Sequence, residues 1–268
     1  RYIGDWSSDV CSSDLDIDKF MIPQKEAISQ TAFYAVAVFI ATVVEIPGRA
    51  LFQIVNPLVA KALNTNNFTE LKMLYKESSL NLLIISGLFF LLINLNIVPF
   101  YELMDNPSYG TAVWVVLMIS LSKLILMSFG CGPAILATSK FYKITLPFSI
   151  GMALSVYFLN DYLIDLMGIN GAALSTLIVV TLFTFLKIIY IKSKLNLSPF
   201  SFNSVKALLI IGSLFLIFEN ISFPFKGISL IIINSLVIGL VYTLVVYYSN
   251  LSGTLNKFLR NILSKLRF

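Results

Sequence analysis

Long apolar runs separated by short polar connectors dominate the chain. A transmembrane helix needs about 20 consecutive, mostly apolar residues. The runs are too long for membrane-barrel strands and do not alternate between apolar and polar residues. The sequence therefore predicts an all-α integral membrane protein of about seven transmembrane helices. The predicted spans are roughly 29–58, 79–100, 109–128, 142–160, 167–190, 205–222 and 227–248.

The positive charges fall on alternate connectors. One set, the connectors 59–78, 129–143 and 187–206 with the C-terminal tail, carries most of the Lys and Arg residues. The other set carries only Lys19, Lys25 and Lys226 together with most of the acidic residues. Because cationic connectors stay in the cytoplasm, this asymmetry predicts that Asp16 lies outside and Phe268 inside.

Composition agrees with lipid as the solvent. Hydrophobic residues make up 57% of the 268 residues and charged residues 12%, against about 25% charged in soluble domains. The net charge of +5 sits in short connectors, as topology requires, and does not indicate a nucleic-acid partner. The chain has no His and only Cys11 and Cys131, which disfavours a zinc site, a disulfide framework and a His-based triad. No metal or cofactor is expected.

Both ends of the chain differ from the middle. Residues 5–15 resemble one translated frame of a sequencing-library adapter, so residues 1–15 are treated as non-native and the reading frame is expected to begin in mid-gene. Residues 16–250 form the predicted bundle. The tail 251–268 has apolar residues at helical spacing opposite Lys and Arg, which predicts an amphipathic helix on the inner leaflet; the alternative is a solvated tail.

Polar signals also mark helix ends. Asn67 precedes Glu70 at capping-box spacing, so a helix is expected over 66–78. Gly130 and Gly132 flank Cys131, and with Pro133 they favour a turn between spans over a gating bend.

Two ionisable residues, Glu45 and Arg49, lie in the middle of the first predicted span, on either side of Pro47 and Gly48. A charge at that depth costs at least about 2.5–3.5 kcal/mol, which makes it a functional candidate. Pro47 should kink the helix and free carbonyl groups. In one hypothesis Arg49 binds an anionic head group, and Glu45 modulates or couples this binding. The kink at Pro47 and Gly48 then acts in gating. In the other, the i, i+4 pair only holds the kink.

Lys123 is the third intramembrane candidate. It lies five residues before the predicted end of its span. Its ammonium could face a cavity, or its long side chain could reach the interface. Both interpretations stay open from the sequence.

The order of several segments resembles the bacterial polysaccharide exporters, the O-antigen-type flippases of the multidrug/oligosaccharidyl-lipid/polysaccharide exporter superfamily. The segments are DIDKFMI (16–22), FYAVAVFIATVVEIPGRALFQIVNPLVAKAL (33–63), LYKESSLNLLIISGLFFLLI (74–93), SKFYK (139–143) and GINGAALST (168–176). That family has fourteen helices in two halves, and the resemblance places this chain as the C-terminal half.

The resemblance implies alternating access about a central cavity. The cargo would be an undecaprenyl-pyrophosphate-linked oligosaccharide moving from the inner to the outer leaflet of the bacterial inner membrane. Arg49 and Lys123 would hold the pyrophosphate, and the partners would be membrane lipids, the N-terminal half and a coupling cation. Relatives often carry an acidic residue three places after the lysine, where this chain has Leu126, which puts the lysine–carboxylate coupling pair of that family in doubt here.

Other functions are weighed against this one. A cation-coupled small-molecule exporter of the same superfamily should have acidic cavity residues. A membrane polysaccharide polymerase or acyltransferase should need intramembrane His and Asp residues or a large outer loop. The predicted outer connectors are short and hold only solvated carboxylates, among them Asp161 and Asp165. We therefore expect a transporter and not an enzyme.

Overall fold

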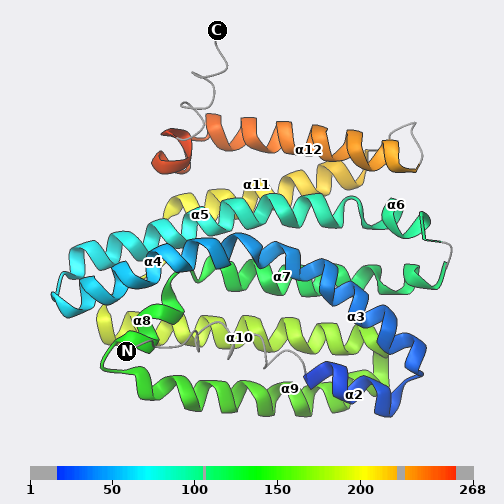
Figure 1. Ribbon diagram of the computed structural model, residues 1–268, viewed down its shortest axis with the longest axis horizontal. Coiled ribbons are helices and arrows are strands. Elements are labelled where there is room, and N and C mark those ends of the chain that lie inside the picture. The colour runs from blue at the N-terminus through cyan, green and yellow to red at the C-terminus, as the bar shows by residue number, and fades with distance from the viewer. Residues whose placement is uncertain (1–16, 105–106, 222–226, 258–268) are drawn as a thin grey trace, which may run out of the picture.

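The computed structural model describes residues 17–104, 107–221 and 227–257, which form helices and contain no strand. Within them, seven helices are long and apolar enough to cross a membrane. They lie side by side in one bundle (Figure 1). The all-α membrane architecture is therefore confirmed. The seven spans are Ile28–Asn64, Phe68–Asn94, Tyr109–Ser128, Tyr142–Met167, Ile169–Leu195, Phe202–Glu219 and Ile228–Tyr248.

Three helices meet at one apolar core: α3 (Ile28–Thr42), α7 (Val113–Ser128) and α10 (Ile169–Leu195). Helix α7 packs on α3 and on α10. Small residues bring these helices close, because a short side chain lets two backbones approach. The alanines of α3 and α10 that are buried in this core are Ala37, Ala41, Ala172 and Ala173.

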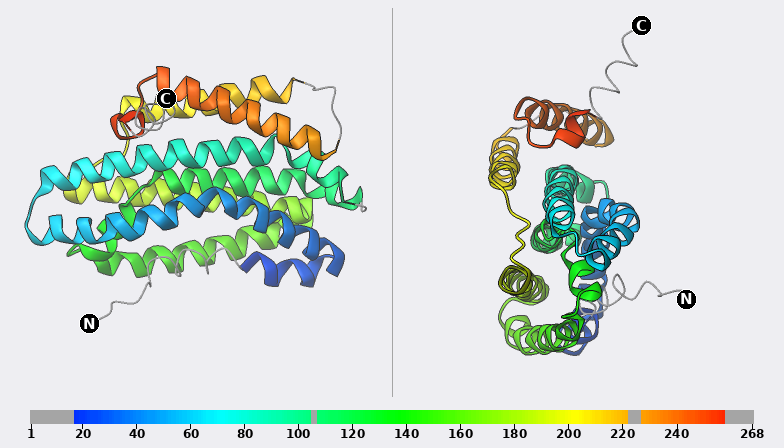
Figure 2. Two further views of the ribbon diagram at one scale, coloured as in Figure 1. Left: turned by 45° about the horizontal axis from the view of Figure 1, so that its top comes forward. Right: turned by 90° about the vertical axis from the view of Figure 1, so that its left-hand side faces the viewer.

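The other helices extend the bundle from this core. Helix α9 (Thr145–Met167) packs on α10, and α5 (Phe68–Asn94) packs on α7 and on α4 (Ile46–Asn64). The short α2 (Ile17–Lys25) lies against α3 and α9. Figure 2 shows α11 (Phe202–Glu219) and α12 (Ile228–Tyr248) at one edge, where both contact α5.

The first span breaks near its middle. Residues Val43–Glu45 form a 3₁₀ turn, η1, between α3 and α4. Pro47 has no N–H with which to bond the Val43 carbonyl four residues earlier. The Ile46 N–H bonds that carbonyl instead, three residues back, which tightens the turn. The kink expected at Pro47 is therefore a 3₁₀ break just before it, whereas Pro57 lies inside the continuous helix α4.

Helix α5 corrects a predicted boundary. The capping segment and the second span are one helix that begins at Phe68. The Asn67 side chain accepts a hydrogen bond from the Glu70 N–H at 3.2 Å and donates one to the Glu70 carboxylate at 2.9 Å, as its spacing predicted. The helix ends at Asn94, and α6 (Ile97–Glu102) follows separately, so the prediction of one span to residue 100 is wrong.

The α9–α10 hairpin turns within a single residue. Gly168 has a φ of +59°, a left-handed conformation that glycine adopts without strain. A Cβ on Gly171 would lie 2.0 Å from the Leu163 carbonyl oxygen, so the two helices touch where the sequence has small residues. Asp161 and Asp165 belong to α9 and not to a loop. Both carboxylates bind Lys25, and the hydrogen bond to Asp161, followed by that to Asp165, raises the pKa of the Lys25 ammonium.

Gly130 makes the turn that was expected after the third span, with a φ of +58°. A short helix, α8 (Gly132–Thr138), follows it. Cys131 is fully buried beside the Ser78 hydroxyl, and burial raises the pKa of its thiol to about 11. In the tail, residues 253–257 are helical. The rest of the predicted amphipathic helix, like residues 1–16, lies outside the described residues.

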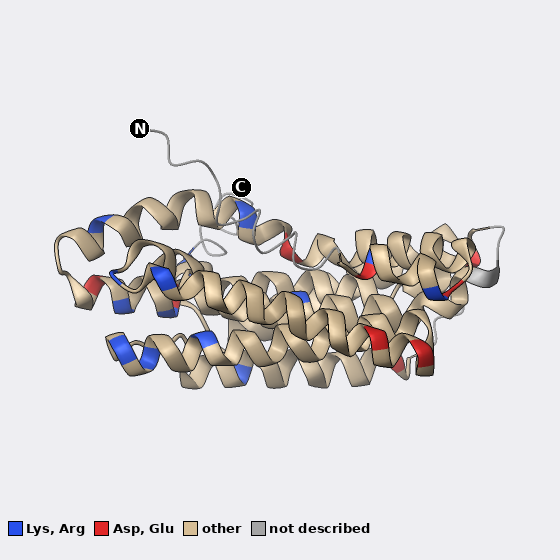
Figure 3. Ribbon diagram, turned by 90° about the horizontal axis from the view of Figure 1, so that it is seen from below, with Lys and Arg blue, Asp and Glu red and all other residues tan. Residues whose placement is uncertain are grey.

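The charges segregate along the bundle. Figure 3 shows most Lys and Arg residues at one end and most Asp and Glu residues at the other. The ends of α4 and α10 that lead into basic connectors lie at the first end, and α6 and the turn between α9 and α10 lie at the second (Figure 1). The described parts of the two connector sets thus occupy opposite ends of the bundle.

Candidate functional site

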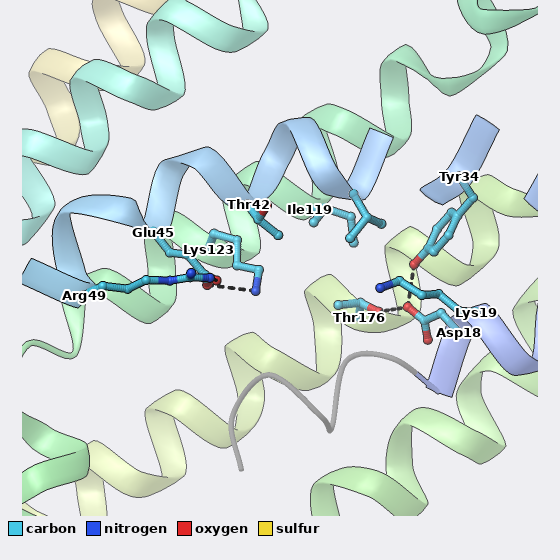
Figure 4. Close-up of a pocket in the computed structure, with 10 residues that line it drawn as sticks. Asp18, Lys19, Tyr34, Thr42, Glu45, Arg49, Ile119, Lys123 and Thr176 are labelled. Atoms are coloured by element: carbon cyan, nitrogen blue, oxygen red, sulfur yellow. Dashed lines mark hydrogen bonds and ion pairs between the residues drawn. The ribbon is translucent and has the colours of Figure 1, made fainter. Parts of the chain in front are cut away.

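A charged pocket lies between α2, α3, α7 and α10, and it has a volume of about 130 Å³. Figure 4 shows two polar groups at its opposite ends, with Thr42 and Ile119 between them. The charged residues that line the pocket are Asp18, Lys19, Glu45, Arg49 and Lys123. All three of the intramembrane residues proposed from the sequence therefore meet in one place.

Glu45 is the centre of the first group. It sits in the η1 turn, where the helix break directs its side chain toward α7 (Figure 4). One of its carboxylate oxygens accepts a hydrogen bond from the Lys123 ammonium at 2.9 Å. The other pairs with the Arg49 guanidinium at 3.4 Å. A single carboxylate thus bridges two cations, one from its own helix and one from α7.

The two cations differ sharply in exposure. The Lys123 side chain is 6% exposed and that of Glu45 is 14% exposed, whereas the Arg49 side chain is 71% exposed. Lys123 therefore does not extend toward the interface, because its ammonium is bound to Glu45 inside the bundle. Arg49 reaches along the open side of the pocket (Figure 4).

Lys123 does have a carboxylate partner, although not at the position that the resemblance implies. Leu126 does occupy the position three residues later, but Glu45 supplies the carboxylate from 78 residues earlier in the chain. A buried lysine without a partner would carry a large desolvation cost. The pair offsets part of that cost, and it also ties the helix break to α7.

Gly48 permits the approach of α4 to α7. A Cβ at Gly48 would lie 2.6 Å from the Met127 sulfur. Pro47 stands at the first turn of α4, where a missing N–H costs nothing. These two residues therefore set where Glu45 and Arg49 lie, and a role in gating stays a prediction.

Asp18 is the centre of the second group, and the sequence did not single it out as a pocket residue. Its side chain is fully buried, although the sequence placed Asp18 in an outer connector. It accepts hydrogen bonds from Tyr34 at 2.5 Å, from Thr176 at 2.6 Å and from the Asn160 amide. Asp18, Tyr34, Asn160 and Thr176 come from α2, α3, α9 and α10, so four helices converge on one carboxylate.

The same group contains a buried oxygen that accepts no hydrogen bond from the described residues. The side-chain oxygen of Asn160 is buried and has no hydrogen-bond partner among the described residues. Buried polar atoms are nearly always bonded, so such an atom calls for an explanation. Oxygen atoms of a carboxylate, an amide and a hydroxyl are the ligands that hard cations prefer.

Sequence reasoning could have found part of this second group. Asp18 lies in DIDKFMI, where apolar residues at positions 17, 20, 21 and 22 surround it at helical spacing. That pattern indicates a helix with Asp18 on or near its buried face. Asn160 and Thr176 carry no such signal, because neutral polar residues are common inside apolar spans.

Comparison with known proteins adds no relative. No family model, curated protein or solved structure matches the chain. The function must therefore be argued from the pocket and from the fold that surrounds it.

Proposed function

We propose that this chain is part of a transporter that moves a lipid-linked oligosaccharide, bearing a pyrophosphate, from the inner to the outer leaflet of a bacterial plasma membrane. The observation that carries the proposal is the pocket that has Lys19 of α2 and the intramembrane cations Arg49 and Lys123 on its walls. The order of sequence segments that resembles the polysaccharide exporters supports it. The proposed activity is transport and includes no covalent step.

The chemistry of the cations suits a pyrophosphate head group. The planar guanidinium of Arg49 can bind two phosphate oxygens at once, and Lys123 offers a compact positive charge beside it. With Lys19 included, three cations line the pocket against Asp18 and Glu45. Cations inside a bundle are costly unless they serve a ligand or pair with a carboxylate. Lys123 and Arg49 both pair with the Glu45 carboxylate. We propose that they also bind a ligand.

The size of the pocket limits what this chain can hold by itself. A volume of about 130 Å³ is well below the roughly 300–1,000 Å³ of typical ligand pockets. It suits a charged head group and not a glycan. Arg49 is 71% exposed near the middle of a span, a position at which lipid contact is unfavourable. Both observations favour a second half of the transporter that covers this side and completes the cavity.

The break at η1 offers a place for movement. Irregular backbone at membrane depth is tolerated where it is buried in protein or lines a cavity. The η1 turn does line the pocket, through Glu45. In the proposed cycle α3 and α4 reorient about this turn while the head group stays bound to Arg49 and Lys123. Pro47 and Gly48 would set the direction of that movement.

The test is Arg49→Ala in the complete protein, expressed in a bacterium that lacks its own copy. We expect loss of surface polysaccharide at unchanged protein level, because Arg49 is an exposed cation of the pocket that an incoming head group can reach. Lys61→Ala is the matched control, since Lys61 is an exposed cation on the same helix outside the pocket, and it should leave the polysaccharide normal. Normal polysaccharide in Arg49→Ala at normal membrane abundance would refute the proposal.

One observation favours a second function, a cation-coupled exporter of small molecules. The Asp18 group supplies a buried carboxylate and an unbonded amide oxygen, as a site for a coupling cation would. Such an exporter should still move its cargo when Arg49 is replaced by Ala. Retained resistance to cationic drugs in Arg49→Ala, together with normal surface polysaccharide, would favour this function over the first.

A further inference from the structure

We propose that Glu45 is an internal counter-ion that a ligand can displace. Its carboxylate binds Arg49 and Lys123, which we call the anion site. Only a ligand with more negative charge than the carboxylate takes its place there. The proposal rests on the proposed function, because it takes Arg49 and Lys123 as the residues that bind the head group. It adds a specificity-determining residue to that site and a rule for which anions the site accepts.

The geometry makes Glu45 a competitor of any bound anion. Both of its carboxylate oxygens are engaged, one with Lys123 at 2.9 Å and the other with Arg49 at 3.4 Å. A phosphate group that bridges these two cations needs the space that the carboxylate fills. Because the Lys123 side chain is 6% exposed, an anion also cannot surround its ammonium while Glu45 remains in place.

The charge of an anion then decides whether it can displace Glu45 from Arg49 and Lys123. Arg49 and Lys123 carry two positive charges, and Glu45 neutralises one of them. A singly charged anion that replaces Glu45 exchanges one negative charge for another and gains no electrostatic energy. A pyrophosphate brings at least two charges to the same cations, so the exchange is favourable in the low dielectric of the bundle. Glu45 thus sets a charge threshold for binding.

The position of Glu45 connects binding to the helix break. Glu45 is the last residue of η1, and its bond to Lys123 ties this turn to α7. A ligand that displaces the carboxylate releases the tie. When the ligand leaves, the carboxylate can return to Lys123 and restore it. Ligand exchange and movement about the break are coupled by this one side chain.

The experiment titrates inorganic pyrophosphate and inorganic phosphate into the purified complete protein in nanodiscs, by calorimetry at constant ionic strength. We expect Glu45→Gln to bind pyrophosphate at least about tenfold more tightly than the wild type, since the competing charge is gone. The affinity of Glu45→Gln for phosphate should rise by a larger factor than its affinity for pyrophosphate. The ratio of the two affinities is therefore smaller in Glu45→Gln than in the wild type. Asp165→Asn is the matched control, because it removes one carboxylate from a cation, Lys25, outside the pocket. It should change neither affinity.

The outcomes separate this inference from the proposed function. If Lys123→Gln binds pyrophosphate as tightly as the wild type does, the proposal that Arg49 and Lys123 bind the head group is refuted. If Lys123→Gln weakens binding but Glu45→Gln does not tighten it, only the counter-ion role is overturned. Absence of binding in both the wild type and Glu45→Gln overturns both. Should Glu45→Gln fold poorly, Glu45→Asp keeps the charge but shortens its reach to Lys123. It should tighten pyrophosphate binding several-fold, and an unchanged affinity would overturn the counter-ion role.

Discussion

Lys123 and Glu45 lie 78 residues apart in the chain and are joined at 2.9 Å in the structure. Each was a candidate from the sequence because a charge inside an apolar span is costly. Their pairing was not foreseen, since the only expected partner of Glu45 was Arg49, one helical turn away. The local pair does form, but at 3.4 Å, and the bond between helices is the shorter of the two.

Asp18 provides a test at the scale of a single residue. If its carboxylate and the Asn160 oxygen hold a coupling cation such as Na⁺, that cation should stabilise the folded protein by mass action. At ten times its dissociation constant the gain is about 1.4 kcal/mol. We expect the melting temperature of the wild type to be higher in NaCl than in KCl of equal ionic strength, and Asp18→Asn to lose this difference.

Asp165→Asn is a suitable control, because Asp165 is an exposed carboxylate that pairs with Lys25 outside the pocket. It should keep the full difference between the two salts. Equal melting temperatures of the wild type in NaCl and KCl would count against a sodium site at Asp18. A difference that survives in Asp18→Asn would place the sodium site elsewhere.

Among the elements, the helix break shows how a local rule acts through structure. Pro47 predicts an interruption wherever the chain is helical, since a backbone bond is lost there. The structure places the interruption at Val43–Glu45 and thereby points Glu45 into the bundle. Pro57 lacks an N–H as well, yet it lies within the unbroken helix α4. The local rule by itself therefore does not say which proline interrupts a helix.

The α9–α10 contact gives a prediction at the scale of an element. Gly171→Ala puts a methyl group 2.0 Å from a backbone oxygen of α9, so the helices must separate. We expect a loss of about 1–3 kcal/mol in stability, the usual cost of overpacking. Gly239→Ala is the matched control, because a Cβ there meets nothing within 4 Å. It should gain about 0.5–1 kcal/mol, since alanine favours a helix over glycine.

Unfolding of both variants in mixed detergent micelles with increasing dodecyl sulfate, followed by circular dichroism, measures the two effects. If Gly171→Ala is as stable as the wild type, the close approach of α9 and α10 at this residue is wrong. Equal losses in both variants would mean that the change reflects glycine replacement in general and not this contact.

At the scale of the whole molecule, the charges divide the bundle into a basic and an acidic end. We propose that the basic end faces the cytoplasm, following the positive-inside rule. Cysteines placed singly at Lys72 and at Glu102 should then label on opposite sides with a membrane-impermeant maleimide. In intact cells only the cysteine at Glu102 should react.

The native Cys131 can stay in these variants, because its burial raises the thiol pKa to about 11. At pH 7 the reactive thiolate is therefore rare at this position, and the background labelling should be low. Cys11 is replaced by Ser. Reaction of both introduced cysteines from the same side would contradict the arrangement of the spans as well as their orientation.

The sequence by itself determined which segments enter the membrane, because the free energy of inserting a segment is a sum over its own residues. It also marked Glu45, Arg49 and Lys123, since a charged residue inside an apolar span is costly and can be recognised from the span alone. Only the tertiary structure decided their partners and revealed the Asp18 group, whose Asn160 lies 142 residues further along the chain. Such contacts depend on how separate helices pack, and no local pattern of residues encodes that packing.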